Sequence, residues 1–365
     1  MHMADTLVSP AVGGTMWAIT AGVAVYSAKK IKEESNERKA PLMGVLGAFV
    51  FAAQMINFSI PGTGSSGHFA GGMLLAILLG PYAGFITMAS VLFIQALFFA
   101  DGGLLALGAN IFNMGFLPCF VAYPLIYKKI LGEHAGKRRL FTGSIISAVI
   151  ALQLGAFGVV IETLLSGITE LPFSKFVLLM QPIHLAIGVV EGIVTAGVIV
   201  FVRKARPELL EPVEAFRGVS APSTRVLSMK KVLIGLGILA LICGGILSWF
   251  ASTYPDGLEW SMFKVAGTEE IRPPEGRLHS AMARIQEKLS FLPDYDFKRP
   301  ESPSPESPSD EELSSSEEQA WPSVSPGTTV SGLVGGGITL FLAGMIGFVL
   351  VRRLSKNGVA REGER

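Results

Sequence analysis

Long apolar runs, each about the length needed to cross a lipid bilayer, constrain this chain more than any other feature. A helix needs about 20 predominantly apolar residues to cross a hydrocarbon core of about 30 Å, and such runs recur between Val12 and Val351. Half of the 365 residues are apolar and only 16% are charged. Because backbone polar groups in the bilayer core must be paired within the protein, we predict an all-α, polytopic membrane protein.

The apolar runs predict about seven transmembrane helices, followed by two more that flank an external segment. The third run is too short to cross, since twelve helical residues reach about 18 Å, and it ends at Gly80-Pro81. We therefore expect the loop before it to dip into the membrane, as irregular segments at transporter substrate sites do. The expected spans cover residues 12–28, 42–58, 69–80, 85–99, 104–126, 141–165, 176–202, 232–250 and 332–351.

Basic residues predict the orientation of these spans. Most of the 30 Lys and Arg residues fall within residues 29–39, 128–139 and 203–231 or in the C-terminal tail. Loops rich in Lys and Arg stay on the cytoplasmic side. The N-terminus is therefore expected outside the cell and the C-terminus in the cytoplasm.

A polar stretch with three prolines divides the chain into two units. The first unit is expected at 1–206, a cytoplasmic linker at 207–229, and the second unit at 230–355. The second unit has an external loop at 251–326, which we expect to be partly disordered over 300–326, where Pro, Ser, Glu and Asp predominate. The start of that loop, 254–260, is expected to contact the external loops of the first unit.

The first two residues predict a metal chelate. Initiator methionine is normally removed only before a small residue, so Met1 is expected to keep a free α-amine. The Met1 amine, the deprotonated amide of His2 and His2 Nδ1 can then close a five-membered and a six-membered ring on one ion. This planar set of nitrogens suits Ni(II) or Cu(II) better than tetrahedral Zn(II). A fourth nitrogen is expected from His68, which follows a glycine-rich loop on the same side of the membrane.

Five polar residues near these positions are candidates to orient the imidazoles or to hold the N-terminal segment. Histidines that bind metal usually hydrogen-bond to such groups, and polar groups at membrane depth usually face the bundle interior. Ordinary interhelical hydrogen bonding is the alternative role for each. His184 is expected to pack within its span and His279 to lie away from the site. The five candidates are Asn57, Gln95, Asp101, Asn110 and Asn113.

Signatures of enzymes are missing from the sequence. It contains no His-Glu-x-x-His, no Gly-x-Ser-x-Gly and no phosphate-binding loop. Cys119 and Cys243 both lie in apolar runs, where a thiolate metal site is not expected. We therefore expect neither enzymatic activity nor a nucleic-acid partner, and a transporter driven by ATP would need other polypeptides.

Several motifs of the first 205 residues occur together in one family of membrane proteins. They are Met1-His2-Met3-Ala4-Asp5, Gly64 to His68, Gly80-Pro81, Gln95 to Gly103, Gly108-Ala109-Asn110 and Asn113-Met114-Gly115. Together they resemble the CbiM/NikM family, the substrate-specific components of energy-coupling factor (ECF) transporters for cobalt and nickel. The second unit, with Pro255-Asp256-Gly257-Leu258-Glu259, resembles the small accessory component of the CbiN/NikN or PDGLE type, fused in one chain.

The resemblance implies an importer of Ni²⁺ or Co²⁺ in a bacterial or archaeal cell membrane, with the metal held by Met1, His2 and His68. It also implies separate ATPase subunits (CbiO/NikO-like) and a transmembrane coupling subunit (CbiQ/NikQ-like). Cobalt members commonly carry Glu-Gly after Met-His, so Met3-Ala4-Asp5 favours nickel. The alternatives are a cobalt importer serving cobalamin biosynthesis, a metal-independent permease for small molecules, and a membrane scaffold built on the external loop.

Overall fold

A computed structural model describes most of the chain, namely residues 1–34, 36–132, 136–169, 171–210, 228–267, 276–298, 322 and 324–362. Side chains are described up to Val351, except at 207–208. Two expected features lie largely outside these residues. Most of the linker falls at 211–227, and most of the stretch expected to be disordered falls at 300–321.

Within the described residues the fold is a bundle of helices with one small hairpin. The α-helices are α1 (Pro10–Glu34), α2 (Lys39–Gln54), α3 (Gly72–Leu79), α4 (Pro81–Phe98), α5 (Leu107–Ile111), α6 (Lys128–Leu131), α7 (Lys137–Ser166), α8 (Phe173–Ala205), α9 (Met229–Gly245), α10 (Gly257–Ala266), α11 (Arg277–Leu289) and α12 (Pro326–Glu362). A π-helix, η2 (Phe112–Tyr127), joins α5 to α6. Short 3₁₀ turns are η1 (Asp5–Leu7), η3 (Pro207–Leu210), η5 (Leu247–Phe250) and η6 (Pro293–Tyr295), and the strands are β1 (Phe58–Ile60) and β2 (Ser65–Gly67).

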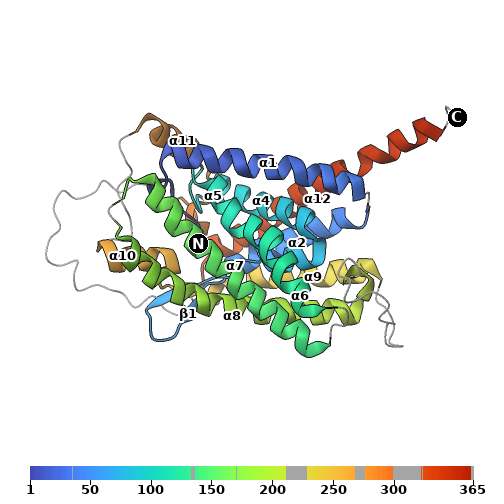
Figure 1. The fold of residues 1–365 in the computed structure, drawn as a ribbon, viewed down its shortest axis with the longest axis horizontal. Helices are drawn as coiled ribbons and strands as arrows, with labels where there is room; N and C mark the ends of the chain where they lie inside the picture. Colours follow the sequence, from blue (N-terminus) through green and yellow to red (C-terminus); the bar gives the residue numbers. More distant parts are fainter. Residues whose placement is uncertain are drawn as a thin grey trace.

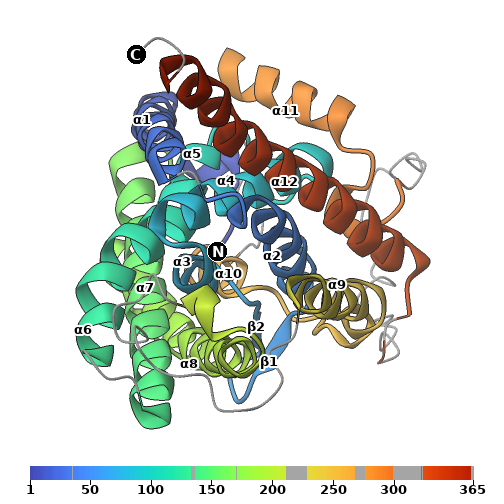
Figure 2. The same ribbon diagram turned by 90° about the vertical axis from the view of Figure 1, so that its right-hand side faces the viewer.

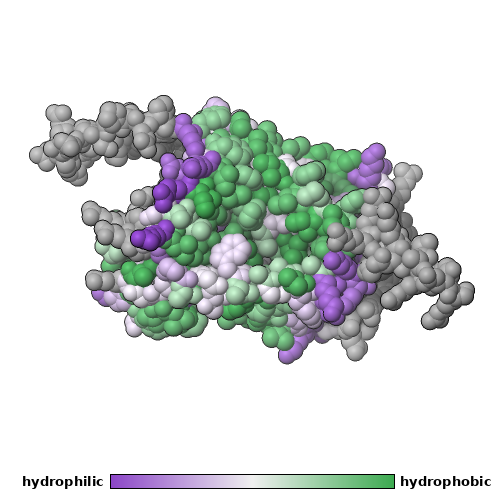
Figure 3. Space-filling model, turned by 90° about the horizontal axis from the view of Figure 1, so that it is seen from above, coloured by the Kyte–Doolittle hydropathy of each residue, from purple (hydrophilic) through white to green (hydrophobic). Residues whose placement is uncertain are grey.

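The length and apolar character of these helices confirm an all-α, polytopic membrane fold. Six helical stretches in the described part are long and apolar enough to cross a membrane: α1, α4, 107–131, α7, α8 and 326–351. The other three expected spans are shorter, with 16 residues in α2, 8 in α3 and 17 in α9. An apolar band covers the surface between hydrophilic residues near the two ends (Figure 3).

The second unit packs directly against the first. α6 and the end of α12 lie at one end of the bundle, and α10, α11 and β1 lie at the other (Figure 1). α9 and α12 contact α2 on the side of the bundle away from α7 and α8 (Figure 2). In addition, α10 contacts α8 and α11 contacts α4. The described part of the loop at 251–326, which we expected only as a polar segment, therefore forms two α-helices, α10 and α11, that cover one end of the first unit.

The segment that precedes His68 is a β-hairpin rather than an irregular loop. β1 and β2 pair antiparallel, with Ile60 opposite Ser65 at the turn. Gly62 and Gly64 in the turn have φ of +76° and +74°, which glycine adopts without steric cost. The glycine-rich composition that we interpreted as a loop thus supplies the turn of a hairpin, and β2 ends directly before His68.

Backbone hydrogen bonds connect this hairpin to the second unit. The Ser66 amide donates to the carbonyl of Pro255 at 2.8 Å, and the Ser252 amide donates to the carbonyl of Asn57 at 2.7 Å. The Ser66 hydroxyl also donates to the carbonyl of Tyr254 at 2.7 Å. These bonds confirm the expected contact between the start of the loop at 251–326 and the loops of the first unit next to His68.

Small residues allow α2 and α12 to approach each other closely. A Cβ atom on Gly44 would lie 2.6 Å from the carbonyl oxygen of Leu340 and 3.3 Å from Cα of Gly344. Membrane helices commonly associate through such small residues, because van der Waals packing between backbones replaces the hydrophobic driving force of water. Gly44 therefore marks a backbone-to-backbone contact between the two units.

We predict that Gly44→Val destabilises the protein by about 1–3 kcal/mol, because the added atoms meet backbone that cannot move without separating α2 from α12. Thermal unfolding of the detergent-solubilised protein should show a lower midpoint. Gly14→Val is the matched control, since nothing lies within 4 Å of a Cβ atom on Gly14 of α1. Equal midpoints for the two variants would contradict the close packing.

Candidate metal centre

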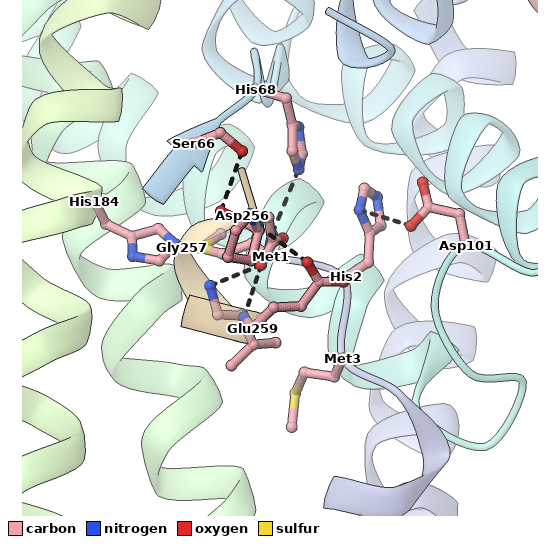
Figure 4. A network of polar contacts seen from close by, with 12 residues as sticks. Met1, His2, Met3, Ser66, His68, Asp101, His184, Asp256, Gly257 and Glu259 are labelled. Atoms are coloured by element: carbon pink, nitrogen blue, oxygen red, sulfur yellow. Dashed lines mark hydrogen bonds and ion pairs between the residues drawn. The ribbon is translucent and has the colours of Figure 1, made fainter. Parts of the chain in front are cut away.

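The N-terminal nitrogen lies inside the protein, beside His68. Met1 is only 6% exposed, and its nitrogen lies 3.4 Å from His68 Nε2 and 2.9 Å from Asp256 Oδ2. The rings of His2 and His68 stack with their centroids 5.2 Å apart and 15° between their planes. The structure thus brings together the three residues that the sequence nominates as ligands, as Figure 4 shows.

The segment that carries Met1 and His2 is held by hydrogen bonds to the loop and helix around α5. Asn110 Oδ1 accepts from the Met3 amide at 2.8 Å, and Asn110 Nδ2 donates to the Met3 carbonyl at 3.1 Å. The Gly103 amide donates to the same carbonyl at 2.9 Å. Asp5 Oδ1 accepts from the Ala106 amide at 2.9 Å. Asn110 therefore holds the N-terminal segment, which is one of the two roles expected for it.

The segment that carries His68 is held by buried polar side chains of α2 and α8. Glu191 Oε2 accepts from the Ala70 amide at 3.0 Å, and Gln54 Nε2 donates to the Ala70 carbonyl at 2.8 Å. Gln95 Nε2 donates in turn to Gln54 Oε1 at 2.8 Å. Gln95 thus acts on the His68 segment through Gln54. A buried backbone amide and carbonyl need such partners, so these contacts determine where the segment can lie.

Asp101 contacts the His2 imidazole directly. Asp101 Oδ1 lies 3.2 Å from His2 Nδ1, which is the kind of carboxylate contact that orients metal-binding histidines. His2 Nε2 is buried and has no hydrogen-bond partner among the described residues. The chelate expected from the sequence uses Nδ1, so forming it requires this nitrogen to leave Asp101 and turn toward the Met1 amine.

The remaining candidate residues have other partners. Asn113 Nδ2 donates to Glu162 at 2.7 Å, which is the interhelical role. Asn57 lines the same cavity as His2 and His68. His184 Nδ1 lies 2.8 Å from the Met180 carbonyl of its own helix, as expected. His279 was expected away from the site, but its Nε2 lies 3.0 Å from the carbonyl of Val8 in the N-terminal segment.

A cavity of about 250 Å³ opens beside the two histidines and is also lined by Asp101, Asp256 and Glu259. This volume exceeds that of several waters, at about 30 Å³ each. No three His, Cys, Asp or Glu side chains of the described part of the chain form a metal cluster. The site expected from the sequence is of a different kind, because two of its nitrogens belong to the main chain.

Burial controls the protonation of the two imidazoles. Burial, and then the positive charge of the Met1 ammonium, lower the pKa of His2 and of His68 to about 3. Burial by itself would raise the pKa of Asp256, but the Met1 ammonium holds that pKa below its ordinary value. The Asp256 charge and then burial raise the pKa of Glu259 to about 7. At neutral pH the imidazoles are therefore uncharged, which is the form that binds metal.

Asp256 is the residue of this site that sequence reasoning missed. A signal for its local role is present, because Asp256 and Glu259 form a capping box at the start of α10, and the Asp-x-x-Glu spacing is typical of helix N-termini. The sequence carries no signal for its pairing with Met1, which lies 255 residues away. Only the docking of α10 brings the two together.

Comparison with known proteins identifies the family of both parts of the chain. The profile described as "Cobalt uptake substrate-specific transmembrane region" (CbiM) matches residues 2–209, and that of the PDGLE domain matches residues 230–352. The fused nickel transport protein NikMN of Rhodobacter capsulatus is 31% identical over 320 residues, which cover 81% of this chain and 88% of that protein. The cobalt transport protein CbiM of Geobacter sulfurreducens is 30% identical over 58% of this chain and 61% of its own length.

A solved structure of a transition metal transporter is also similar, with 32% identity and a TM-score of 0.51 over 60% of this chain and all of that one. The fold and these similarities define a membrane component of a transition-metal transport system, not an enzyme. The chain belongs to the CbiM family and carries a CbiN-type PDGLE domain fused behind the CbiM part.

We predict that one extra residue before Met1 abolishes high-affinity binding of Ni²⁺ although no side chain is lost. The extension turns the Met1 nitrogen into an amide, which is neither a cation for Asp256 nor a ready metal ligand. Calorimetric titration should show the loss, and intact mass should confirm each N-terminus. A C-terminal tag is the control and should leave binding unchanged. Undiminished affinity in the extended protein would exclude the Met1 nitrogen as a ligand.

We also predict that metal affinity falls as the pH is lowered from about 8 to about 5. Both imidazoles are already neutral in this range, because their pKa values are about 3. Glu259, whose pKa is raised to about 7, lines the same cavity and gains a proton in this range, and metal binding through the His2 amide must also displace the proton of that amide. Titrations in buffers of different ionisation enthalpy measure the protons released, and a count near zero at neutral pH would contradict binding through the amide.

Proposed function

We propose that this protein is the substrate-binding membrane component of an ATP-driven importer of the ECF type for transition-metal cations. The single observation that supports this best is the buried Met1 nitrogen, 3.4 Å from His68 Nε2, with the neutral His2 ring stacked on His68. Burying an amine at the end of a chain is costly unless it is paired. A fold that encloses it between Asp256 and His68, next to a second neutral imidazole, favours recognition of a nitrogen-seeking cation.

The proposed ligands are the Met1 amine, the nitrogens of His2 and His68 Nε2. Neutral imidazole and amine nitrogens suit Ni²⁺ and Co²⁺ alike, and geometry discriminates between the two ions. The planar chelate formed by Met1 and His2 favours Ni²⁺, as does the sequence Met3-Ala4-Asp5. Cobalt is the second candidate, because the matching profile is described by cobalt uptake.

The proposed division of the chain assigns metal binding to residues 1–206 and an accessory role to the unit at 230–355, with the linker 207–229 between them. ATPase and coupling subunits would be separate chains. The N-terminus is proposed outside and the C-terminus in the cytoplasm of a bacterial or archaeal cell. Basic residues in the last turns of α1, α6 and α8 support this orientation.

Purified protein exposed to equal concentrations of Ni²⁺ and Co²⁺ should retain mainly nickel when its metal content is determined by elemental analysis. His68→Ala is the comparison, and we expect at least about 100-fold weaker binding of either ion, since even outer contacts of a metal site are worth about 10–100-fold. An excess of cobalt would overturn the nickel assignment. Retention of metal by His68→Ala would overturn the ligand set.

A further inference from the structure

The PDGLE domain reaches the N-terminal nitrogen through one carboxylate with two functions. Asp256 Oδ1 accepts from the amides of Leu258 and Glu259 at 2.8 and 2.9 Å, and so caps α10. Asp256 Oδ2 lies 2.9 Å from the Met1 nitrogen. Because the cap fixes one oxygen, the other is aimed at Met1 by the start of a helix.

The position of Asp256 is also tied to the segment that carries His68. The Ser66 amide donates to the carbonyl of Pro255, and Ser66 and Asp256 form a parallel β-bridge. Asp256 directly follows Pro255, which accepts the bond from Ser66, and His68 lies two residues after Ser66. The carboxylate and the imidazole are held in register by main-chain bonds, so the Met1 nitrogen lies between two fixed groups.

The same domain reaches His2 through a second carboxylate. The Tyr295 hydroxyl donates to Asp101 Oδ2, while Asp101 Oδ1 lies 3.2 Å from His2 Nδ1. The Tyr295 ring stacks on Phe99 at 5.2 Å between centroids. Nearby, Gln286 Nε2 of α11 donates to the carbonyl of Gly102 at 2.7 Å. Tyr295 and Gln286 therefore hold the short loop that presents Asp101 to His2.

We infer that the PDGLE domain completes the metal site, with Asp256 as the counter-ion that positions the Met1 nitrogen and Tyr295 as the residue that positions His2 through Asp101. This inference rests on the proposed function. Asp256 faces a cation in either case, the ammonium of Met1 or a divalent ion bound to its nitrogen. Both residues are positioning residues, since each acts on the metal through a proposed ligand.

Asp256→Asn separates the two functions of the carboxylate. Asparagine caps helices as well as aspartate does, so α10 should remain folded, while the amide offers no charge to Met1. We expect about 10–100-fold weaker binding of Ni²⁺ by calorimetry, which is the usual effect of losing an outer contact of a metal site. Without metal, the thermal midpoint should fall, because the variant leaves the buried Met1 ammonium without its counter-charge.

Glu287→Gln is the matched control, because it removes one exposed carboxylate from the same domain. It should bind Ni²⁺ as the parent does. Asp256→Ser tests the charge again, since serine also caps helices. If Asp256→Asn or Asp256→Ser unfolds, the other Asp256 variant and Tyr295→Phe still test whether the PDGLE domain contributes to metal binding.

Tyr295→Phe keeps the stacking on Phe99 and removes only the hydroxyl. We expect about tenfold weaker binding and a changed visible absorption spectrum of bound Ni²⁺. Without the hydrogen bond from Tyr295, Asp101 accepts more strongly from His2 Nδ1, which must turn from Asp101 to reach the metal. A purely structural role of the ring would leave both unchanged.

Full affinity in both Asp256→Asn and Tyr295→Phe, measured beside His68→Ala, would overturn the inference. If His68→Ala then loses the metal, the proposed ligands stand and only the contribution of the PDGLE domain fails. If His68→Ala binds as the parent does, the proposed function itself fails.

Discussion

The burial of the N-terminal ammonium is the interaction on which the rest of this structure depends. A charge removed from water must be compensated by a partner held in good geometry. Here the Met1 nitrogen pairs with Asp256 at 2.9 Å, and its positive charge also helps to keep the neighbouring imidazoles neutral. The first residue of the chain is thereby packed into the core between helices, where the end of most chains would be solvated.

When a chain terminus is buried, the backbone amides and carbonyls of the segment that leads to it need hydrogen-bond partners. The N-terminal segment finds its partners in Asn110 and Gly103 on one side and in His279 of α11 on the other. The His68 segment finds its partners in Gln54 and Glu191. Buried polar side chains within the bundle, which are costly when unpaired, thus serve as anchors for the two segments that meet at the site.

Residues of both units contact one another around the Met1 nitrogen, so the second unit is part of the surroundings of this nitrogen. α12 packs on α2 through glycine contacts, and α9 also contacts α2. This docking brings α10 and α11 over the N-terminal segment. In this arrangement Asp256 contacts Met1, and Tyr295 contacts Asp101. A fused chain keeps these contacts at high effective concentration, because α8 and α9 belong to one polypeptide.

The sequence by itself determined the membrane-spanning character and the position of most helices, and it nominated Met1, His2 and His68 as candidate ligands. These depend on local properties, namely the length of apolar runs and the ring sizes of a chelate built from adjacent residues. The tertiary structure decided what the spacing does not encode. The glycine-rich segment before His68 forms a hairpin, and three expected spans are shorter than predicted. Asn113 bonds to Glu162 rather than to a histidine, and Asp256 pairs with Met1. Such pairings depend on how helices dock, and docking arises from side-chain packing between distant segments, which no local pattern in the sequence specifies.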